Sequence, residues 1–449
     1  MHSTTGRTAT PRAAAMVAAA IAVVVTGAAL LVVPARGDVA PTSPRTGTTR
    51  IVDPFAPYEK RTLRLGQTNA ATRVVQTYLH VRPANGHFGR STRRAVRAFQ
   101  RVHRLPRTGR VDRRTWAALR ARFSHSVTTP SAGAGNTGSG LPGQLFAPYF
   151  QSYRGTDLAA ATEASGARYV DIGFLETAGS GSCTLLWRDV GAAEAGSVFT
   201  DGIEQVRASG GDVIMSFGGG AGSARLSELA DSCTSVDAIA GELERVIGLY
   251  DLRRIDFDIE GVALTDRAGV ERRNRALAQV VAWAAASHRR LDIQYTLPVA
   301  TYGLLDDGLA LLRSAVRNGV PVAIVNVMTF DYYDGARHEM AQDTISAATA
   351  VQKQLRALWP KKTDAQLWAM IGVTEMPGID DHGADETFTL ADAATVRRWA
   401  SDRHLGLLSF WALQRDNGGC PGAVGSDTCS GVSQGPYAFA HAFSGFTAS

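Results

Sequence analysis

Three carboxylates recur at every second residue in the segment RRIDFDIEG, residues 253–261. They are Asp256, Asp258 and Glu260, and apolar residues separate them. Such alternation is typical of a β-strand, in which successive side chains point to opposite faces. The three carboxylates are therefore expected on one face, with neighbours about 7 Å apart along the strand. Carboxyl groups this close together and away from bulk water do not all ionise at neutral pH, so the segment predicts acid–base chemistry.

Strand-like apolar runs surround this segment in the sequence. They alternate with amphipathic stretches such as residues 270–290. Eight strands alternating with helices in roughly 300 residues predict an α/β fold of the (β/α)8 TIM-barrel type rather than a doubly wound sheet. In a barrel the chemistry lies at the carboxyl ends of the strands, which puts the three carboxylates at the mouth with Glu260 outermost. The expected strands are residues 145–153, 168–175, 212–220, 253–261, 291–299, 322–330, 367–374 and 405–413.

The N-terminal 36 residues predict export. Residues 13–34 contain no charged side chain, with Arg7 and Arg12 before them and Arg36 after them. This pattern is typical of a secretory signal peptide or of an uncleaved signal anchor, and the sequence leaves both open. We therefore expect an extracellular protein, or one associated with the cell surface or the cell wall. Membrane contact is expected only through this segment.

The chain contains four cysteines, and their number is consistent with export. An even number in an exported protein favours two disulfide bonds, for which three pairings are possible. A bond between Cys420 and Cys429 closes a short glycine-rich loop, which leaves Cys183 and Cys233 for each other. A metal site is the rival interpretation. No C-x-x-C motif or histidine cluster supports it, and we expect neither a metal nor a cofactor.

Charge is distributed very unevenly along the chain. Residues 59–123 carry 17 Lys and Arg against two acidic residues, a net charge of +15, whereas residues 124–449 carry 25 basic and 37 acidic residues. Residues 37–58 and 124–143 are rich in Pro, Thr, Gly and Ser and are interpreted as linkers. The sequence therefore predicts a small basic domain at residues 59–123 and an acidic barrel at residues 144–449.

The basic block contains a quasi-repeat, GHFGRSTRRAV (86–96) and GRVDRRTWAAL (109–119). In each copy a Thr at the start of a helical pattern is expected to line the first turn, and the apolar residues after it are expected to point inward. The block resembles the small three-helix peptidoglycan-binding domain of bacterial wall enzymes. The resemblance implies an all-α domain that precedes the barrel and binds wall peptidoglycan. So many arginines also fit nucleic-acid binding, but export argues against a nucleic-acid partner.

The barrel carries a second resemblance. IDFDIE is similar to the core of the D-x-x-D-x-D-x-E signature of family 18 glycoside hydrolases, the chitinase family. MSFGGG (215–220), VNVMTFDYY (325–333) and SFWALQRDNGGC (409–420) resemble further strands of that family, in the same order. The chain departs from the pattern in two places. Arg253 and Arg254 stand where the family has Asp and Gly, and Phe330 stands where many members have a Tyr that binds the substrate's acetamido group.

The resemblance implies roles for particular residues. Glu260 is expected to be the proton donor, with its pKa raised by anionic neighbours. Asp258 is expected to orient the substrate's acetamido group and to share a proton with Asp256. Trp411 is expected to lie under the bound sugar, and Met328 to pack beneath it. Gln294, Asp331 or Tyr332 could supply the contact of the missing Tyr hydroxyl, and Tyr149 on the first strand could line the same subsite. The expected substrate-binding residues are therefore Trp411, Tyr149, Gln294, Met328, Asp331 and Tyr332.

Three functions remain open from the sequence. The first is a chitinase that acts on chitin or N-acetylglucosamine oligomers and retains the anomeric configuration. The second is an N-acetylglucosaminidase acting on peptidoglycan, whose chains also carry N-acetyl groups. The third is a non-catalytic protein that binds chitin or wall sugars, although such proteins usually lack the acid that Glu260 provides here.

Overall fold

The computed structural model describes residues 58–79, 81, 85–102, 105–128, 141–177, 179–188, 198–220 and 228–447. The predicted export segment, residues 1–36, and most of both predicted linkers lie outside the described residues. None of the helices in the part of the chain that the structure describes has the length and apolar character needed to cross a bilayer.

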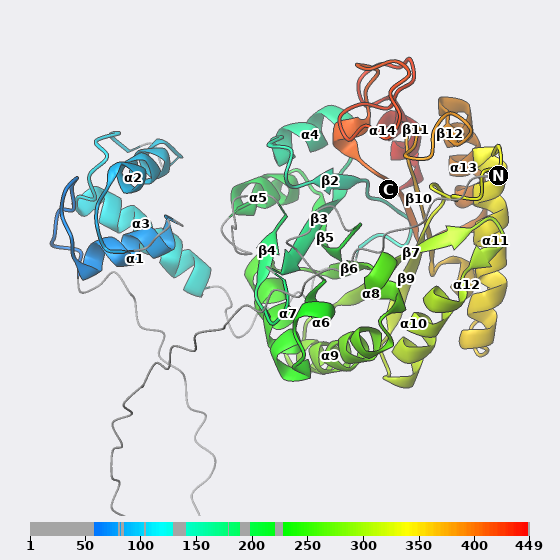
Figure 1. The fold of residues 1–449 in the computed structure, drawn as a ribbon, viewed down its shortest axis with the longest axis horizontal. Coiled ribbons are helices and arrows are strands. Elements are labelled where there is room, and N and C mark those ends of the chain that lie inside the picture. The colour runs from blue at the N-terminus through cyan, green and yellow to red at the C-terminus, as the bar shows by residue number, and fades with distance from the viewer. Residues whose placement is uncertain are drawn as a thin grey trace, which may run out of the picture. The chain divides into compact units, whose positions relative to one another are not determined.

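The basic block folds as three helices, as the sequence predicted (Figure 1). They are α1 (Ala70–Tyr78), α2 (Arg90–Val102) and α3 (Arg113–Thr128). Val96, Phe99, Trp116 and Leu119 are buried in their common core, which confirms the inward-facing pattern.

The quasi-repeat is also a repeat in hydrogen bonding. Gln76 accepts a bond from the Gly86 amide and donates to His87 O and Thr92 Oγ1. Gln100 does the same for the second copy, with the Gly109 amide, Arg110 O and Thr115 Oγ1. Each buried Gln thus ties one helix to the loop and the first turn of the next helix. This satisfies polar groups that would be costly to bury alone.

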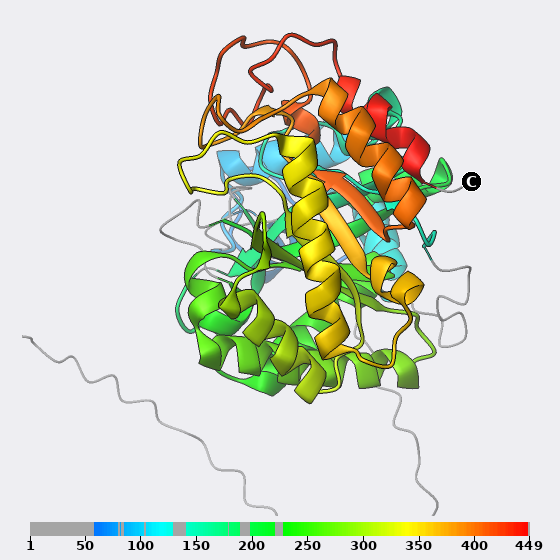
Figure 2. The same ribbon diagram turned by 90° about the vertical axis from the view of Figure 1, so that its right-hand side faces the viewer.

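The larger domain is a closed parallel barrel, which confirms the predicted fold class (Figures 1 and 2). The first strand is split into β1 (Leu145–Phe146), which pairs with the last strand, and β2 (Tyr149–Gln151), which pairs with the second. Pro148, which has no N–H, lies at the split. The other barrel strands are β3 (Tyr169–Thr177), β5 (Asp212–Gly218), β6 (Arg254–Asp258), β7 (Asp292–Ala300), β9 (Val322–Met328), β10 (Ile371–Glu375) and β13 (Leu407–Phe410).

One strand begins later than predicted. Residues 367–374 were expected to be extended, but Leu367 and Trp368 end the short helix α12 (Asp364–Trp368). A capping box formed by Thr363 and Gln366 starts that helix. Because of this local cap, Leu367 and Trp368 are helical, although the periodicity assigned them to the strand.

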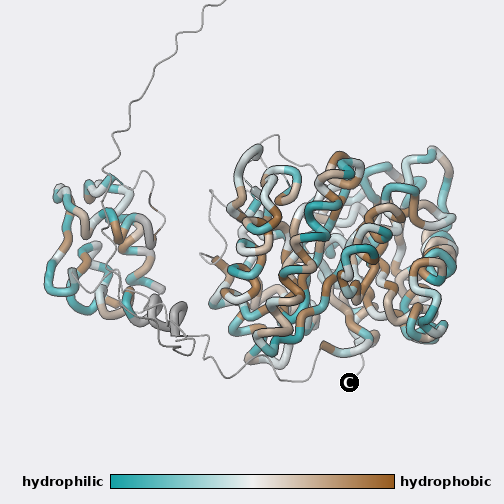
Figure 3. The backbone as a smooth tube through the Cα atoms, turned by 90° about the horizontal axis from the view of Figure 1, so that it is seen from below, coloured by the Kyte–Doolittle hydropathy of each residue, from teal (hydrophilic) through white to brown (hydrophobic). Residues whose placement is uncertain are grey.

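Helices cover the outside of the barrel (Figures 1 and 2). The apolar face of β6, namely Ile255, Phe257 and Ile259, is fully buried in the layer between strands and helices, as predicted. Bands of apolar and polar residues alternate along these outer helices in Figure 3. This is the pattern of helices with one face on a core. The main outer helices are α4 (Leu158–Ser165), α5 (Thr200–Ala208), α7 (Val236–Tyr250), α9 (Arg267–Ala286), α10 (Asp306–Arg317), α11 (Met340–Leu358) and α13 (Leu390–Arg403).

Both disulfide bonds of the favoured pairing are present. Cys183 is bonded to Cys233, and Cys420 is bonded to Cys429.

Candidate active site

The three carboxylates lie together at the carboxyl end of β6. Asp256 is the middle residue of that strand and Asp258 its last, and Glu260 follows it in extended conformation, immediately before α8 (Gly261–Thr265). Asp256 is fully buried and Asp258 nearly so, whereas Glu260 is partly exposed. Depth in the barrel therefore increases from Glu260 to Asp256.

Asp256 is held by hydroxyl groups from three other strands. Tyr149 Oη and Ser216 Oγ donate to its Oδ2 at 2.9 and 2.6 Å, and Thr296 Oγ1 donates to its Oδ1 at 2.8 Å. Burial raises the pKa of Asp256 to about 6, although these hydrogen bonds act in the opposite direction by favouring the charged form. Both oxygens of Asp256 therefore have fixed partners.

Asp258 interacts with both neighbouring carboxyl groups. A hydrogen bond joins its side chain to that of Glu260, the charge of Asp256 also raises its pKa, and its Oδ1 has no hydrogen-bond partner among the described residues. The expected proton sharing between Asp256 and Asp258 stays a prediction. Burial raises the pKa of Asp258 well above its usual value, and the neighbouring charge of Glu260 raises it further.

Burial also raises the pKa of Glu260, while its hydrogen bond with Asp258 and the positive charge of Arg188 lower it. The sequence interpretation attributed a raised pKa to anionic neighbours, so the direction is as expected but the main cause is different. The raised pKa values of Asp258 and Glu260 favour retention of a proton by the pair. This is the condition for a general acid.

Glycines of the MSFGGG segment allow the backbone to approach the carboxylates. A Cβ atom on Gly218 would lie 2.3 Å from Asp258 O, and one on Gly219 would lie 2.5 Å from the Phe174 ring. Both glycines have positive φ, and the backbone of Gly220 hydrogen-bonds Glu260. The sequence analysis also missed the role of the segment's serine, Ser216, which pairs in register with Asp256 on the next strand.

Arg188 is a further residue that the sequence analysis did not find. It is buried, it forms two hydrogen bonds with Glu176, and it donates to the carbonyls of Gly218 and Gly220 at 3.1 and 2.9 Å. Its positive charge lowers the pKa of both Asp258 and Glu260. It follows the short strand β4 (Leu185–Trp187) and belongs to none of the recognised motifs, so no sequence signal identified it.

Aromatic side chains lie beside the carboxylates. Trp411 stacks on Phe174 with ring centroids 5.3 Å apart and planes 14° apart, and its ring is partly exposed. Tyr149 is only 1% exposed, and its ring centroid lies 5.6 Å from that of Trp411. Tyr149 therefore packs beside Trp411 and donates to Asp256. That it lines a sugar subsite stays a prediction.

Two more predicted substrate contacts place their polar groups in the interior. Gln294 is fully buried, and its Nε2 donates to Asp171 Oδ2 at 3.3 Å in the barrel interior. The hydroxyl of Tyr332 is buried without a hydrogen-bond partner among the described residues, and its ring stacks on His338. That either residue replaces the missing Tyr hydroxyl stays a prediction. Phe330, at the departure itself, packs on the barrel core.

Met328 and Asp331 lie at the end of β9 and shortly after it. Met328 is buried. Asp331 Oδ1 accepts a bond from the Asp381 amide at 3.2 Å. Burial and the neighbouring acids Asp380 and Asp381 raise the pKa of Asp331 to about 7. The negative charge of Asp381 in turn raises the pKa of Glu260, which connects this acidic loop to the catalytic pair.

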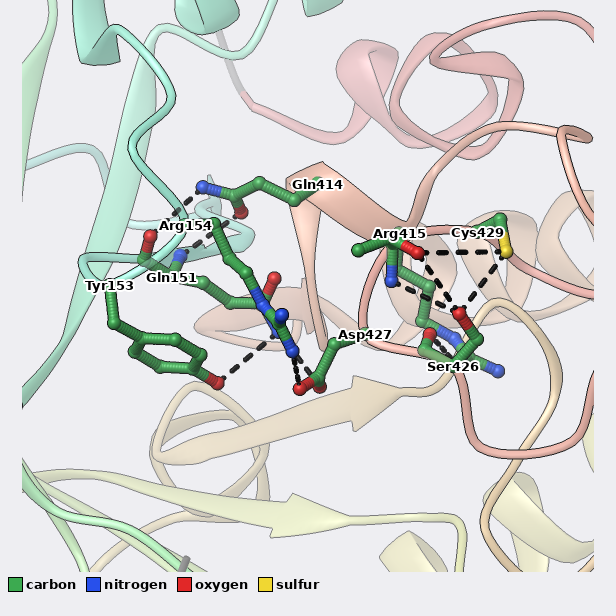
Figure 4. A network of polar contacts seen from close by, with 9 residues as sticks. Gln151, Tyr153, Arg154, Gln414, Arg415, Ser426, Asp427 and Cys429 are labelled. Atoms are coloured by element: carbon green, nitrogen blue, oxygen red, sulfur yellow. Dashed lines mark hydrogen bonds and ion pairs between the residues drawn. The ribbon is translucent and has the colours of Figure 1, made fainter. Parts of the chain in front are cut away.

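A polar network joins the loops after β2 and β13 (Figure 4). The side chain of Gln414 pairs with the backbone of Gln151 through bonds of 3.0 and 3.1 Å. Asp427 accepts a bond from Gln151 Nε2 at 2.9 Å and is paired with Arg154. The loop that carries the Cys420–Cys429 bond is thus fixed to the start of the barrel. No group of three or more His, Cys, Asp or Glu side chains that could hold a metal ion occurs among the described residues.

Similarity to characterised proteins agrees with this geometry. Residues 71–119 match the family described as "Putative peptidoglycan binding domain". The "Probable bifunctional chitinase/lysozyme" of Escherichia coli is 32% identical over 320 residues, which are 68% of this chain and 35% of that protein. "Endochitinase 11" of Metarhizium anisopliae is 36% identical over 222 residues, which are 48% of this chain and 42% of that protein. The chain thus spans roughly a third to two-fifths of the length of these relatives.

Solved structures give the same result. The catalytic domain of a hyperthermophilic chitinase from Pyrococcus furiosus is 29% identical with a TM-score of 0.60, and the match covers 70% of this chain and 97% of that one. The barrel is a family 18 glycoside hydrolase domain. The three helices before it match the peptidoglycan-binding domain family. The barrel is therefore a chitinase-like glycoside hydrolase domain. Its disulfides, together with the match to the peptidoglycan-binding family, indicate an extracytoplasmic, wall-associated location.

Proposed function

We propose that this family 18 domain is a chitinase, which hydrolyses β-1,4 bonds between N-acetylglucosamine units. The observation that carries the proposal is the pair of buried Asp258 and partly exposed Glu260 at the carboxyl end of β6, together with the partly exposed Trp411. The pair offers one proton donor rather than two separate catalytic carboxylates. The chitinase relatives support the substrate class, and one related P. furiosus structure is described as complexed with chito-oligosaccharides.

The proposed mechanism needs only one acid from the protein, because family 18 enzymes use the substrate's own N-acetyl group as nucleophile. Glu260 donates its proton to the oxygen of the scissile bond. As that oxygen leaves C1, the acetamido carbonyl oxygen bonds to C1 and forms an oxazolinium ion. Asp258 turns from Glu260 to accept the acetamide N–H, and Asp256 adds negative potential from below. Water then attacks C1 and gives its proton to Glu260, so the anomeric configuration is retained.

Hydrolysis of soluble N-acetylglucosamine oligomers by the Glu260→Gln variant tests this proposal. Loss of a general acid is expected to lower kcat by about 10²–10⁴-fold while oligomer binding persists. Asp402→Asn, which removes one exposed carboxylate from α13, is the matched control and should keep full activity. Undiminished hydrolysis by Glu260→Gln would refute the proposal.

Peptidoglycan is the second candidate substrate. The peptidoglycan-binding domain supports it, and the name of the E. coli relative includes lysozyme as well as chitinase. Reducing-end release from chitin oligomers and from purified sacculi compares the two substrates directly. Release from sacculi alone would replace the chitinase proposal with an N-acetylglucosaminidase. Sugar binding without turnover by the unaltered protein would leave only the non-catalytic alternative.

We further propose that the protein is exported through residues 1–36 and retained at the wall by residues 59–123. The net charge of +15 on the small domain supports retention by an anionic wall. Fractionation of cells that produce the chain with and without residues 59–123 tests this. The shortened chain should move from the wall fraction to the medium, and unchanged wall association would contradict the proposal.

A further inference from the structure

Helix α2 carries a continuous arginine face. At 100° per residue, five of its arginines fall within an arc of about 100° and extend over about 16 Å of the helix. Val96 and Phe99 of the same helix are buried in the domain core, so the arginine face lies on the other side. The face consists of Arg90, Arg93, Arg94, Arg97 and Arg101, of which all but the partly exposed Arg93 are exposed.

No acidic side chain of this domain neutralises the arginine face. The only two acidic residues of positions 59–123 are engaged elsewhere, since Glu59 pairs with Arg120 and Asp112 caps the start of α3. Like charges three and four residues apart destabilise a helix by about 0.2–0.5 kcal/mol per pair. The first turn of α2 also lacks the acidic residue that would favour the helix dipole. The arginine face therefore lowers the stability of the free helix, which is expected of a binding surface.

The arginine face also borders a surface hollow. An open hollow of about 360 Å³ is lined by Leu65, which is 46% exposed, and by Arg90, Arg93, Arg94 and Arg97. Gly109 packs against two of these side chains, because a Cβ atom there would lie 2.9 Å from Arg93 Cγ and 3.0 Å from Arg97 Nε. The backbone at Gly109 thus lies directly beside the stems of Arg93 and Arg97, next to the hollow.

We propose that this arginine face binds a linear polyanion with regularly spaced phosphodiesters, of the polyol-phosphate class attached to bacterial walls. Sixteen of the 17 basic residues at positions 59–123 are arginine and only Lys60 is lysine. The guanidinium fork binds phosphate through two parallel hydrogen bonds, which lysine cannot do. Side chains three or four residues apart lie about 5–6 Å from each other, so the arginine face presents a row of phosphate sites. The inference rests on the proposed wall location but concerns a partner other than the glycan.

Co-sedimentation of the full chain with two kinds of sacculi tests the inference. One kind keeps its phosphate polymers, and the other has been stripped of them by hydrofluoric acid. The triple variant Arg90→Gln, Arg94→Gln, Arg97→Gln is compared with Arg107→Gln, Arg113→Gln, Arg114→Gln, which removes three exposed charges outside the arginine face. Glutamine keeps good helix propensity, and circular dichroism confirms that both variants fold.

We expect the intact chain to bind unstripped sacculi at least tenfold more tightly than stripped ones. The first variant should lose that difference and reduce the salt dependence by about three charges, while the second should lose less than threefold. Equal binding to both kinds of sacculi, or equal losses by both variants, would overturn the inference. So would displacement by duplex DNA at a far lower phosphate concentration than by free polymer. Hydrolysis of soluble oligomers by the same variants separates this result from the proposed catalysis.

Discussion

Arg188 and Glu176 form a buried ion pair with two hydrogen bonds, 2.6 Å from Nε to Oε2 and 2.9 Å from Nη2 to Oε1. The guanidinium also donates to the carbonyls of Gly218 and Gly220, and the backbone of Gly220 hydrogen-bonds Glu260. Arg188 therefore acts on the catalytic pair in two ways. It fixes the backbone that contacts Glu260, and its charge favours the ionised forms of Asp258 and Glu260.

Replacing Arg188 and replacing Glu176 are expected to shift the pH profile of hydrolysis in opposite directions. Arg188→Met removes the charge that lowers the pKa of Glu260, so the alkaline limb of kcat/KM should move up by roughly half a pH unit. Glu176→Gln leaves the arginine charge less balanced, so the limb should move down by a similar amount.

Simple loss of folded protein would lower kcat/KM in both variants without separating the alkaline limbs of their two pH profiles. The double variant Arg188→Met, Glu176→Gln removes both charges and should return the limb close to its original position. Limbs that move together, or do not move, would contradict the positioning role of Arg188.

Tyr149→Phe should reduce turnover without weakening the binding of oligomers. The variant removes a 2.9 Å hydrogen bond to Asp256 but keeps the ring that supports Trp411. A hydrogen bond to a charged group contributes about 1.5–3 kcal/mol, so we expect kcat to fall by roughly tenfold or more while KM stays within about twofold. A raised KM with unchanged kcat would instead indicate that Tyr149 contacts the sugar.

Glu375→Gln should stabilise the barrel more at alkaline pH than at acidic pH. Burial raises the pKa of Glu375 to about 8, and Thr344 donates to its Oε1 at 2.9 Å. A carboxyl group with a raised pKa contributes stability that is complete below its unfolded pKa, about 4.5, and is lost as the pH rises through 8. The neutral amide avoids this loss. The Tm of the variant relative to the original should therefore rise by at least about 2 °C between pH 5 and pH 8.5 in thermal scans, and a constant difference would contradict the burial of an ionising group.

The two disulfides should differ in their effect on stability. Cys183–Cys233 spans 50 positions and Cys420–Cys429 spans nine. On the chain-entropy account, removal of the longer cross-link by paired Ser substitutions should cost about 4 kcal/mol, and removal of the shorter one about 3 kcal/mol. Urea unfolding of both variants gives the order. A larger cost for the shorter loop would show that its packing, including the fully buried Arg415, outweighs the entropy of closure.

The sequence was sufficient for the features that depend on local periodicity and spacing. Alternation along residues 253–261 predicted a strand with all carboxylates on one face, and the 86–96 and 109–119 copies predicted two helices with inward-facing apolar residues. The preferred pairing of Cys420 with Cys429 followed from loop length. In each case the determining interactions lie within a strand, a helix or a short loop.

Other features depend on side chains from distant strands, and only the tertiary structure determined these. Hydroxyls from β2, β5 and β7 donate hydrogen bonds to Asp256, which the spacing along β6 does not reveal. Tyr149 and Gln294 are buried, and so is the hydroxyl of Tyr332, although their types suggested exposed sugar contacts. Arg188 reaches the glycine segment from a short strand outside the motifs. Sequence spacing fixes which face a side chain occupies, whereas its depth and its partners depend on how the closed barrel brings eight strands together.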